Sequence, residues 1–203
     1  MPHDLPRLDP HRVIVTLPPL AADDLVAAGE VLWQEELRVW SVARLADLEV
    51  LRPAFGRRAT IGVHGLSTPA AVAEAVGAGA AFVASPWAAP GLVEAAGDVP
   101  AVLGGLTPAE LASACALGPA AVQIFPVDAA SDSYADALGD LIGPPPLDVP
   151  LIAAGRLTPA GAKAWLEAGA AAVWPTGLVT WELASGADLD ALRARCQQWQ
   201  LGY

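Results

Sequence analysis

Lysine is almost absent from this sequence: Lys163 is the only one in 203 residues. Chemistry that needs a primary amine, such as formation of a Schiff base with a carbonyl substrate, therefore depends on that single side chain. Basic residues are scarce in general, and the net charge of −11 argues against nucleic acids and anionic membrane surfaces as partners. It does not argue against a small anionic ligand, because a local cavity can be basic on an acidic protein.

Cysteine is scarce, and metal-binding patterns and long apolar runs are missing. Cys115 and Cys196 fit no metal or redox spacing, so we interpret them as buried or incidental thiols. No run is long enough to cross a bilayer, and residues 1–11 lack the apolar centre of a signal peptide, which leads us to expect a cytoplasmic protein. There is no G-x-S-x-G, Walker or dinucleotide fingerprint, and no His/Asp/Glu cluster at the predicted strand ends. We therefore expect neither a metal nor a cofactor.

What the sequence does contain is a repeated template of Thr-Pro, nine residues, Gly and a short apolar run. It occurs at Thr68–Gly79, Thr107–Gly118 and Thr158–Gly169. Thr is a favoured helix N-cap, Pro is tolerated at the first helical position, and Gly can take the left-handed conformation that ends a helix. Each unit thus predicts a short helix between two strands, an alternation that builds a parallel sheet with right-handed crossovers.

The whole pattern predicts a single-domain (β/α)₈ TIM barrel over residues 1–203. Hydrophobic residues make up 54% of the chain, as expected for strands buried on both faces. Eight apolar segments favour a closed barrel over an open flavodoxin-like sheet. A short lead, residues 1–11, precedes the first strand. Strands are expected at 12–17, 37–42, 59–63, 80–85, 101–104, 120–125, 150–154 and 171–174. Helices are expected at 21–32, 45–51, 69–76, 89–96, 108–116, 134–141 and 159–167, with a terminal helix at about 188–200.

Five short runs at the predicted strand ends carry a more specific signal. They are Ile61–Gly65, Ala84–Pro86, Gly104–Thr107, Val122–Pro126 and Ala153–Thr158. In this order and spacing they resemble the class I 2-keto-3-deoxy-6-phosphogluconate (KDPG) and 4-hydroxy-2-oxoglutarate (KHG) aldolase family. The resemblance covers about residues 13–178. Its most specific marks are Ser-Pro on the fourth strand and Phe125-Pro126 on the sixth.

The resemblance implies a lyase that is commonly a homotrimer, but two catalytic positions depart from the family pattern. The Schiff-base lysine falls at Gln123, and the acid/base glutamate falls at Trp40. Gln123 cannot form an imine and Trp40 cannot carry a proton. Lys163 lies in the predicted helix 159–167, outside the barrel wall, so it offers no replacement amine.

Several ligand-binding positions of the family are retained or conservatively replaced. The arginine that receives the substrate carboxylate matches Arg44, while a threonine of the keto-acid site falls at Gly65. In the phosphate turn Gly155 is kept and the second glycine is Arg156; the phosphate-binding serine corresponds to Thr176. The ligand-binding candidates are therefore Arg44, His64, Gln123, Phe125, Pro126, Gly155, Arg156 and Thr176.

Each candidate also has a structural interpretation. Arg44 is either a carboxylate ligand or a solvated residue at a helix start. Arg156 either recruits an anion or fills the phosphate site with its own side chain. His64 is a structural hydrogen-bonding residue or an acid/base. Gln123 holds a buried network or orients a ligand.

Two aromatic residues and one acidic residue also lie at or near the predicted strand ends. Trp40 and Trp174 are expected to plug the lumen, with a stacking platform for a ligand ring as the alternative. Asp128 follows Phe125-Pro126 in a loop and is expected to be exposed to solvent.

Three functions follow from these residues. The first is a divergent member without class I aldol cleavage that binds a small anionic ligand, a keto acid or sugar phosphate. The second is an active lyase or isomerase that works without a Schiff base, with His64 or Arg44 managing proton transfer or enolate charge. The third is a structural or interaction protein whose mouth is closed by Trp40 and Trp174. By resemblance we expect a homotrimer.

Overall fold

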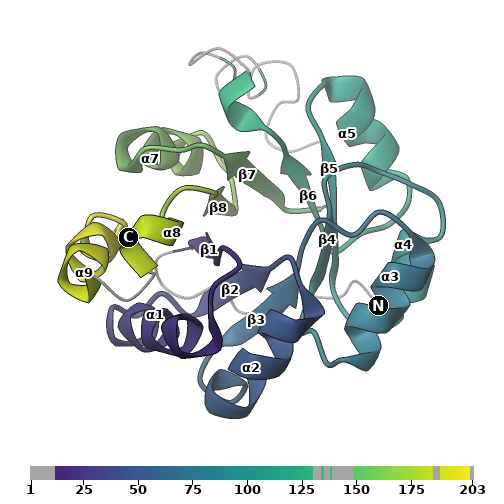
Figure 1. Cartoon of the computed structure of the whole chain (residues 1–203). Helices are drawn as coiled ribbons and strands as arrows, with labels where there is room; N and C mark the ends of the chain where they lie inside the picture. The colour runs from purple at the N-terminus through teal and green to yellow at the C-terminus, as the bar shows by residue number, and fades with distance from the viewer. Residues whose placement is uncertain (1–11, 130–133, 135–137, 139–148, 185–187, 202–203) are drawn as a thin grey trace.

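The computed structural model describes residues 12–129, 134, 138, 149–184 and 188–201. Eight parallel strands follow one another in the order β1 to β8, and a parallel bridge between Val13 and Val173 joins the first strand to the last. The helices form a ring around this sheet, as Figure 1 shows looking along the barrel. The predicted (β/α)₈ TIM barrel is confirmed.

All eight predicted strands are present, most of them shortened at one or both ends. The strands are β1 Ile14–Thr16, β2 Val39–Val42, β3 Thr60–Val63, β4 Val83–Ser85, β5 Ala101–Gly105, β6 Ala121–Ile124, β7 Leu151–Gly155 and β8 Ala172–Pro175. The helices are α1 Ala22–Gln34, α2 Leu45–Phe55, α3 Pro69–Gly77, α4 Leu92–Ala96, α5 Pro108–Cys115, α7 Pro159–Glu167, α8 Trp181–Ala184 and α9 Leu189–Gln197. A 3₁₀ turn, η1 Val127–Ala129, follows β6.

One helix differs from the elements predicted from the sequence, and two predicted segments cannot be compared. The helix α8 was not predicted, because its four residues are too few to show a helical period. The lead, residues 1–11, lies outside the described residues, and so does most of the predicted helix 134–141.

The repeated Thr-Pro units form the helix starts that the sequence predicts. The hydroxyl oxygens of Thr68, Thr107 and Thr158 each accept a hydrogen bond from the backbone N–H three residues later. Thr107 also forms a complete capping box with Glu110. Each unit therefore determines where a helix begins after the carboxyl end of a strand. The strand ends and these helix starts together form the mouth of the barrel.

The core has two layers, because successive side chains along each strand point to opposite faces of the sheet. Residues pointing inward fill the lumen, and residues pointing outward pack beneath the helices. The lumen layer consists of Ile14, Val39, Phe82, Ala84, Val102, Ala121, Ile152, Ala154, Ala172 and Trp174. None of the helices in the described part of the chain is long and apolar enough to cross a membrane.

Candidate functional site

A cavity of about 220 Å³ opens at the carboxyl ends of the strands, where barrels of this type place their sites. It is mostly apolar, and its polar groups come from β1, β6 and the segments that follow β3 and β8. The residues that line it are Thr16, His64, Gly65, Pro86, Gln123, Phe125, Ala154, Trp174 and Thr176. Four of the predicted ligand-binding residues therefore meet at one cavity: His64, Gln123, Phe125 and Thr176.

Gln123 lies in the wall of this cavity and is held in place from behind. Its side chain is 6% exposed, and its Nε2 donates a 2.8 Å hydrogen bond to the backbone carbonyl of Ser85 on β4. The residue thus joins two strands of the barrel while its side chain borders the cavity. Both roles proposed for Gln123 from the sequence, a buried hydrogen-bonding residue and a ligand contact, are compatible with this position.

Trp174 occupies the lumen below the cavity. Its Nε1 donates a 2.9 Å hydrogen bond to Oγ1 of Thr16, and its ring meets those of Phe82 and His64 edge-to-face. Satisfying the indole N–H in this way lets a large aromatic ring be buried at low cost. Trp174 therefore fills the lumen as predicted, although a cavity of about 220 Å³ is left beside it.

His64 follows β3 and is the only histidine among the residues that the structure describes. Its Nδ1 is buried without a hydrogen-bond partner among the described residues, and the residue borders the cavity. Burial lowers the pKa of His64 below its ordinary value of 6.5, because the charged imidazolium is penalised by loss of water. The imidazole is consequently neutral near pH 7 and able to accept a proton.

Trp40 was predicted to plug the lumen, and this prediction is wrong. Its ring points away from the lumen and packs edge-to-face on Phe55 of α2, with ring centroids 5.0 Å apart, and beside Gly29 of α1. Its indole N–H donates to the carbonyl of Leu37. Side chains alternate along a strand, so with Val39 in the lumen layer Trp40 faces the helices. The position that the resemblance matches to the family's glutamate, Trp40, therefore does not face the cavity.

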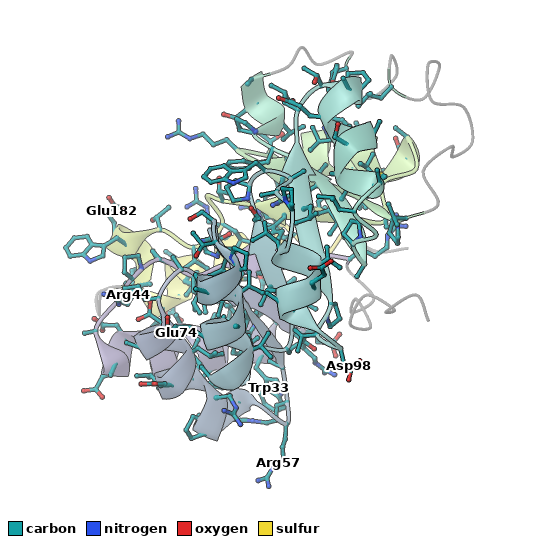
Figure 2. The ribbon with its side chains drawn as sticks, turned by 90° about the vertical axis from the view of Figure 1, so that its right-hand side faces the viewer. Trp33, Arg44, Arg57, Glu74, Asp98 and Glu182 are labelled. Atoms are coloured by element: carbon teal, nitrogen blue, oxygen red, sulfur yellow. The ribbon has the colours of Figure 1, made fainter. Side chains whose placement is uncertain are left out.

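Arg44 lies outside the residues that line the cavity, as the N-cap of α2. Its guanidinium contacts both carboxylate oxygens of Asp47, with Nε–Oδ2 at 2.8 Å and Nη2–Oδ1 at 2.5 Å. The hydrogen bonds that Arg44 donates to the Asp47 carboxylate raise the pKa of Arg44 above its already high value. Figure 2 shows Arg44 at the edge of the molecule, on the same side as Glu182. The fork that was predicted to receive a ligand carboxylate holds a carboxylate of the protein instead.

The turn after β7 is also bonded to a carboxylate of the protein, that of Asp128. The backbone N–H of Arg156 donates a 2.9 Å hydrogen bond to Oδ1 of Asp128. Neither Gly155 nor Arg156 lines the cavity, and Pro126 does not line it either. Asp128 is exposed, as predicted, but its hydrogen bond with Arg156, which is 28 residues away along the chain, was not predicted.

Lys163 lies where the sequence placed it, on the outer helix α7. Its side chain is 60% exposed and its Nζ is 3.8 Å from a carboxylate oxygen of Glu167. Across the described residues no three His, Cys, Asp or Glu side chains form a group that could hold a metal ion.

Three residues that line the cavity were not among the ligand-binding candidates from the sequence, namely Thr16, Pro86 and Ala154. Strand alternation could have found Thr16, which stands two residues after Ile14 of the lumen layer. Pro86 belongs to the Ser-Pro mark of the fourth strand, but its place at the cavity depends on how closely its carbonyl approaches Gly104 of β5.

Comparisons with known structures agree with this fold. No curated protein matches the sequence. KDPG aldolase from Zymomonas mobilis ATCC 29191 has 20% identity and a TM-score of 0.81, covering 97% of this chain and 95% of that one. KDPG aldolase from Legionella pneumophila, with pyruvate captured as a covalent carbinolamine, has 22% identity and a TM-score of 0.81, covering 94% and 93%. 3-Hexulose-6-phosphate synthase from Salmonella typhimurium is more distant, with 13% identity and a TM-score of 0.67 over 94% and 98%.

A family model supplies the assignment that these low identities cannot. The model for KDPG and KHG aldolases matches residues 22–194, which include every strand from β2 to β8. The chain belongs to the KDPG and KHG aldolase family.

Proposed function

We propose that this barrel does not catalyse class I aldol cleavage and instead binds a small oxo or hydroxy compound in the cavity at its mouth. The observation that carries the proposal is the position of Gln123. The amide of Gln123 lies in the cavity wall and donates to the carbonyl of Ser85. The resemblance to the family matches this position to the Schiff-base lysine of class I chemistry, which requires an amine.

No other residue supplies the missing amine. Lys163 is the only lysine, and it is exposed on α7 beside Glu167, on the outer side of the barrel wall. The cavity is lined by no carboxylate within the described residues, so a second part of the class I machinery, a carboxylate that transfers protons, has no counterpart there. These observations support the loss of Schiff-base chemistry rather than a displaced version of it.

The lining of the cavity suggests the class of ligand. Thr16, His64, Gln123 and Thr176 offer hydrogen-bonding groups, and the remaining lining is apolar. A volume of about 220 Å³ lies below the range of sites for drug-sized molecules, which suits a small metabolite. The keto acid predicted from the sequence is the anionic member of this class, and it is the one to test first.

Two measurements on the whole chain test this proposal. Borohydride treatment in the presence of pyruvate should give no covalent adduct on the wild-type protein, by intact mass. Titration with pyruvate at millimolar concentration should shift amide signals of residues that line the cavity. An adduct on the wild-type protein would show that an amine is at work, and absence of any shift at the cavity would remove the binding proposal.

The variants Gln123→Lys and Gln123→Met give a matched comparison. Lysine places an amine in a dry wall, where burial lowers its pKa and favours the neutral nucleophile, whereas methionine has similar length and no amine. We expect trapping of pyruvate by Gln123→Lys and none by Gln123→Met.

A second function, proton transfer without a Schiff base, is favoured by one observation. His64 borders the cavity with a buried Nδ1 and a lowered pKa, so it is neutral near pH 7 and can take a proton from a bound oxo compound. Exchange of the methyl hydrogens of pyruvate with deuterated water, followed by NMR, tests this function. It requires exchange by the wild-type protein that His64→Asn abolishes while binding is retained.

A further inference from the structure

We propose that the cavity at the mouth favours a hydroxyl group over an oxo group, so that its ligand is a small alcohol such as a 2-hydroxy acid. Oε1 of Gln123 is the atom that receives the hydrogen of this hydroxyl. The inference rests on the proposed function, because it takes the cavity as the ligand site and names the class of ligand that fits it. It makes Gln123 a residue that determines specificity.

The orientation of the Gln123 amide is set by its neighbour on β4. The backbone carbonyl of Ser85 can only accept a hydrogen bond, so the amide must turn its NH₂ group toward it, and Nε2 lies 2.8 Å from that carbonyl oxygen. Turning the amide over would place two acceptors against each other. Oε1 of Gln123 is therefore held on the side away from Ser85.

Oε1 of Gln123 has access to the cavity and lacks a donor of its own. Gln123 lines the cavity, and Oε1 accepts no hydrogen bond from the residues that the structure describes. It is not one of the fully buried side-chain atoms without a partner, which include Oγ of Ser41 and Nδ1 of His64. The cavity wall thus presents an acceptor at this point, and the second hydrogen of Nε2 does not remove it.

Thr16 on β1 supplies the opposite polarity. Its Oγ1 accepts the indole N–H of Trp174 at 2.9 Å, and a hydroxyl that accepts one hydrogen bond still has a hydrogen to donate. That hydrogen finds no acceptor within the described part of the chain, and Thr16 lines the cavity. The wall therefore presents a donor at Thr16 and an acceptor at Gln123.

The other two polar residues of the lining do not select between ligands. The hydroxyl of Thr176 can rotate to donate or to accept, and a neutral imidazole such as that of His64 has one N–H and one acceptor nitrogen. Each of them can bond either an oxo group or a hydroxyl group. Selection between the two groups consequently depends on Thr16 and Gln123.

A hydroxyl group matches both polarities of the wall, whereas an oxo group matches only one. A ligand hydroxyl can accept from Thr16 and donate to Oε1 of Gln123, but an oxo oxygen can only accept. An oxo ligand would displace water from Oε1 without giving it a donor, and an acceptor left unpaired in mostly apolar surroundings costs free energy. Sites that are built to bond a hydroxyl reject analogues that lack one.

The test measures the binding of racemic lactate, pyruvate and 2-fluoropropanoate to the full chain by calorimetry and amide NMR. All three carry one carboxylate, so the charges of the protein, including the exposed guanidinium of Arg156, act on them alike. They differ at the second carbon, which bears a hydroxyl, an oxo group or a fluorine that cannot donate. Lactate should bind at least about tenfold more tightly than either of the others, with shifts at the cavity.

Gln123→Met removes the acceptor and keeps a side chain of similar length. It should weaken the binding of lactate to the level of 2-fluoropropanoate and so abolish the preference. Gln197→Met is the matched control, because it makes the same substitution at an exposed residue at the end of α9 that does not line the cavity. It should leave all three affinities as in wild type. Thermal melts show whether each variant is folded, and the wild-type series decides the matter if Gln123→Met is not.

The outcomes separate the inference from the proposed function. Pyruvate or 2-fluoropropanoate binding as tightly as lactate would overturn the preference for a hydroxyl and leave the proposed function standing. A preference for lactate that persists in folded Gln123→Met would overturn the role of Gln123. No binding of any of the three compounds would count against the proposed function and the inference together.

Discussion

Gln123 is the residue on which both the stability and the chemistry of the mouth depend. It is buried, and its amide satisfies the carbonyl of Ser85 across two strands. Replacing it with leucine removes the donor and leaves a buried carbonyl without its partner. We expect Gln123→Leu to lower the free energy of unfolding by about 1–3 kcal/mol, measured by urea denaturation.

Ser113→Ala provides the control for this measurement. Ser113 also donates to a backbone carbonyl, that of Ala109, but it does so on the exposed face of α5. Water can replace that hydrogen bond, so the change should stay within about 0.5 kcal/mol. Equal losses in the two variants would show that burial of the Gln123 amide is not what matters.

His64 gives the protein a dependence on pH whose sign is fixed by its environment. Burial lowers the pKa of His64 below 6.5, so in the range below 6.5 the unfolded chain binds a proton that the folded chain does not. The stability that this residue contributes is present above pH 6.5 and is lost as the pH falls toward the folded pKa. The other histidines, His3 and His11, lie outside the described residues.

The prediction is a loss of unfolding free energy on going from pH 7.5 to pH 5.5 that is smaller in His64→Gln than in wild type. Glutamine keeps a polar group at the cavity but does not titrate. Chemical denaturation at the two pH values measures this loss in each protein. An equal loss of unfolding free energy in His64→Gln and in wild type would mean that His64 is not the residue that titrates.

At the scale of elements, the three Thr-Pro helices provide an internal comparison of capping. All three threonines accept one backbone hydrogen bond, but only Thr107 is part of a reciprocal box, in which Glu110 accepts from the backbone of Thr107 at 2.8 Å and of Leu106 at 2.9 Å. These backbone bonds also lower the pKa of Glu110.

Replacement of each cap by alanine should cost about 1 kcal/mol of unfolding free energy at Thr68 and Thr158. The cost should be larger at Thr107, because Oε2 of Glu110 also receives the Thr107 hydroxyl at 3.0 Å. Three parallel denaturation curves measure these costs. A Thr107→Ala variant no less stable than Thr68→Ala would contradict the importance of the box.

Gly62 on β3 leaves room for the ring of Phe82, which precedes β4. A Cβ at Gly62 would lie 2.5 Å from the ring of Phe82, which fills the lumen below Trp174. We expect Gly62→Ala to cost about 1–3 kcal/mol of unfolding free energy, since the ring must move within a packed core.

Gly77→Ala is the matched control for this substitution. Nothing lies within 4 Å of a Cβ at Gly77, the final residue of α3, and its φ is not positive. The change should be neutral or raise the unfolding free energy by about 0.5–1 kcal/mol, because alanine has less conformational freedom in the unfolded chain. Comparable losses at both glycines would show that contact with Phe82 is not limiting.

The elements and the site differ in how far the sequence could predict them. Helix caps and strand positions depend on neighbours within a few residues, so the repeats at Thr68, Thr107 and Thr158 gave them correctly. The orientation of Trp40 depends on which face of β2 meets the lumen, and matching by sequence position did not respect that alternation. The partner of Arg156 could not be predicted at all, because Asp128 reaches it from another strand's turn.

At the scale of the whole molecule, the family assignment raises the question of assembly. The chain belongs to the KDPG and KHG aldolase family, and its resemblance to that family predicts a homotrimer. We expect sedimentation velocity at micromolar protein concentration to give a mass three times the chain mass of 20.7 kDa. Because association of identical copies follows mass action, dilution should lower the average mass if the interface is weak and leave it unchanged if it is tight. A mass of one chain over the whole concentration range would refute the trimer. That result would also confine the proposal for Gln123 to a monomer, in which one barrel must supply every residue of the mouth.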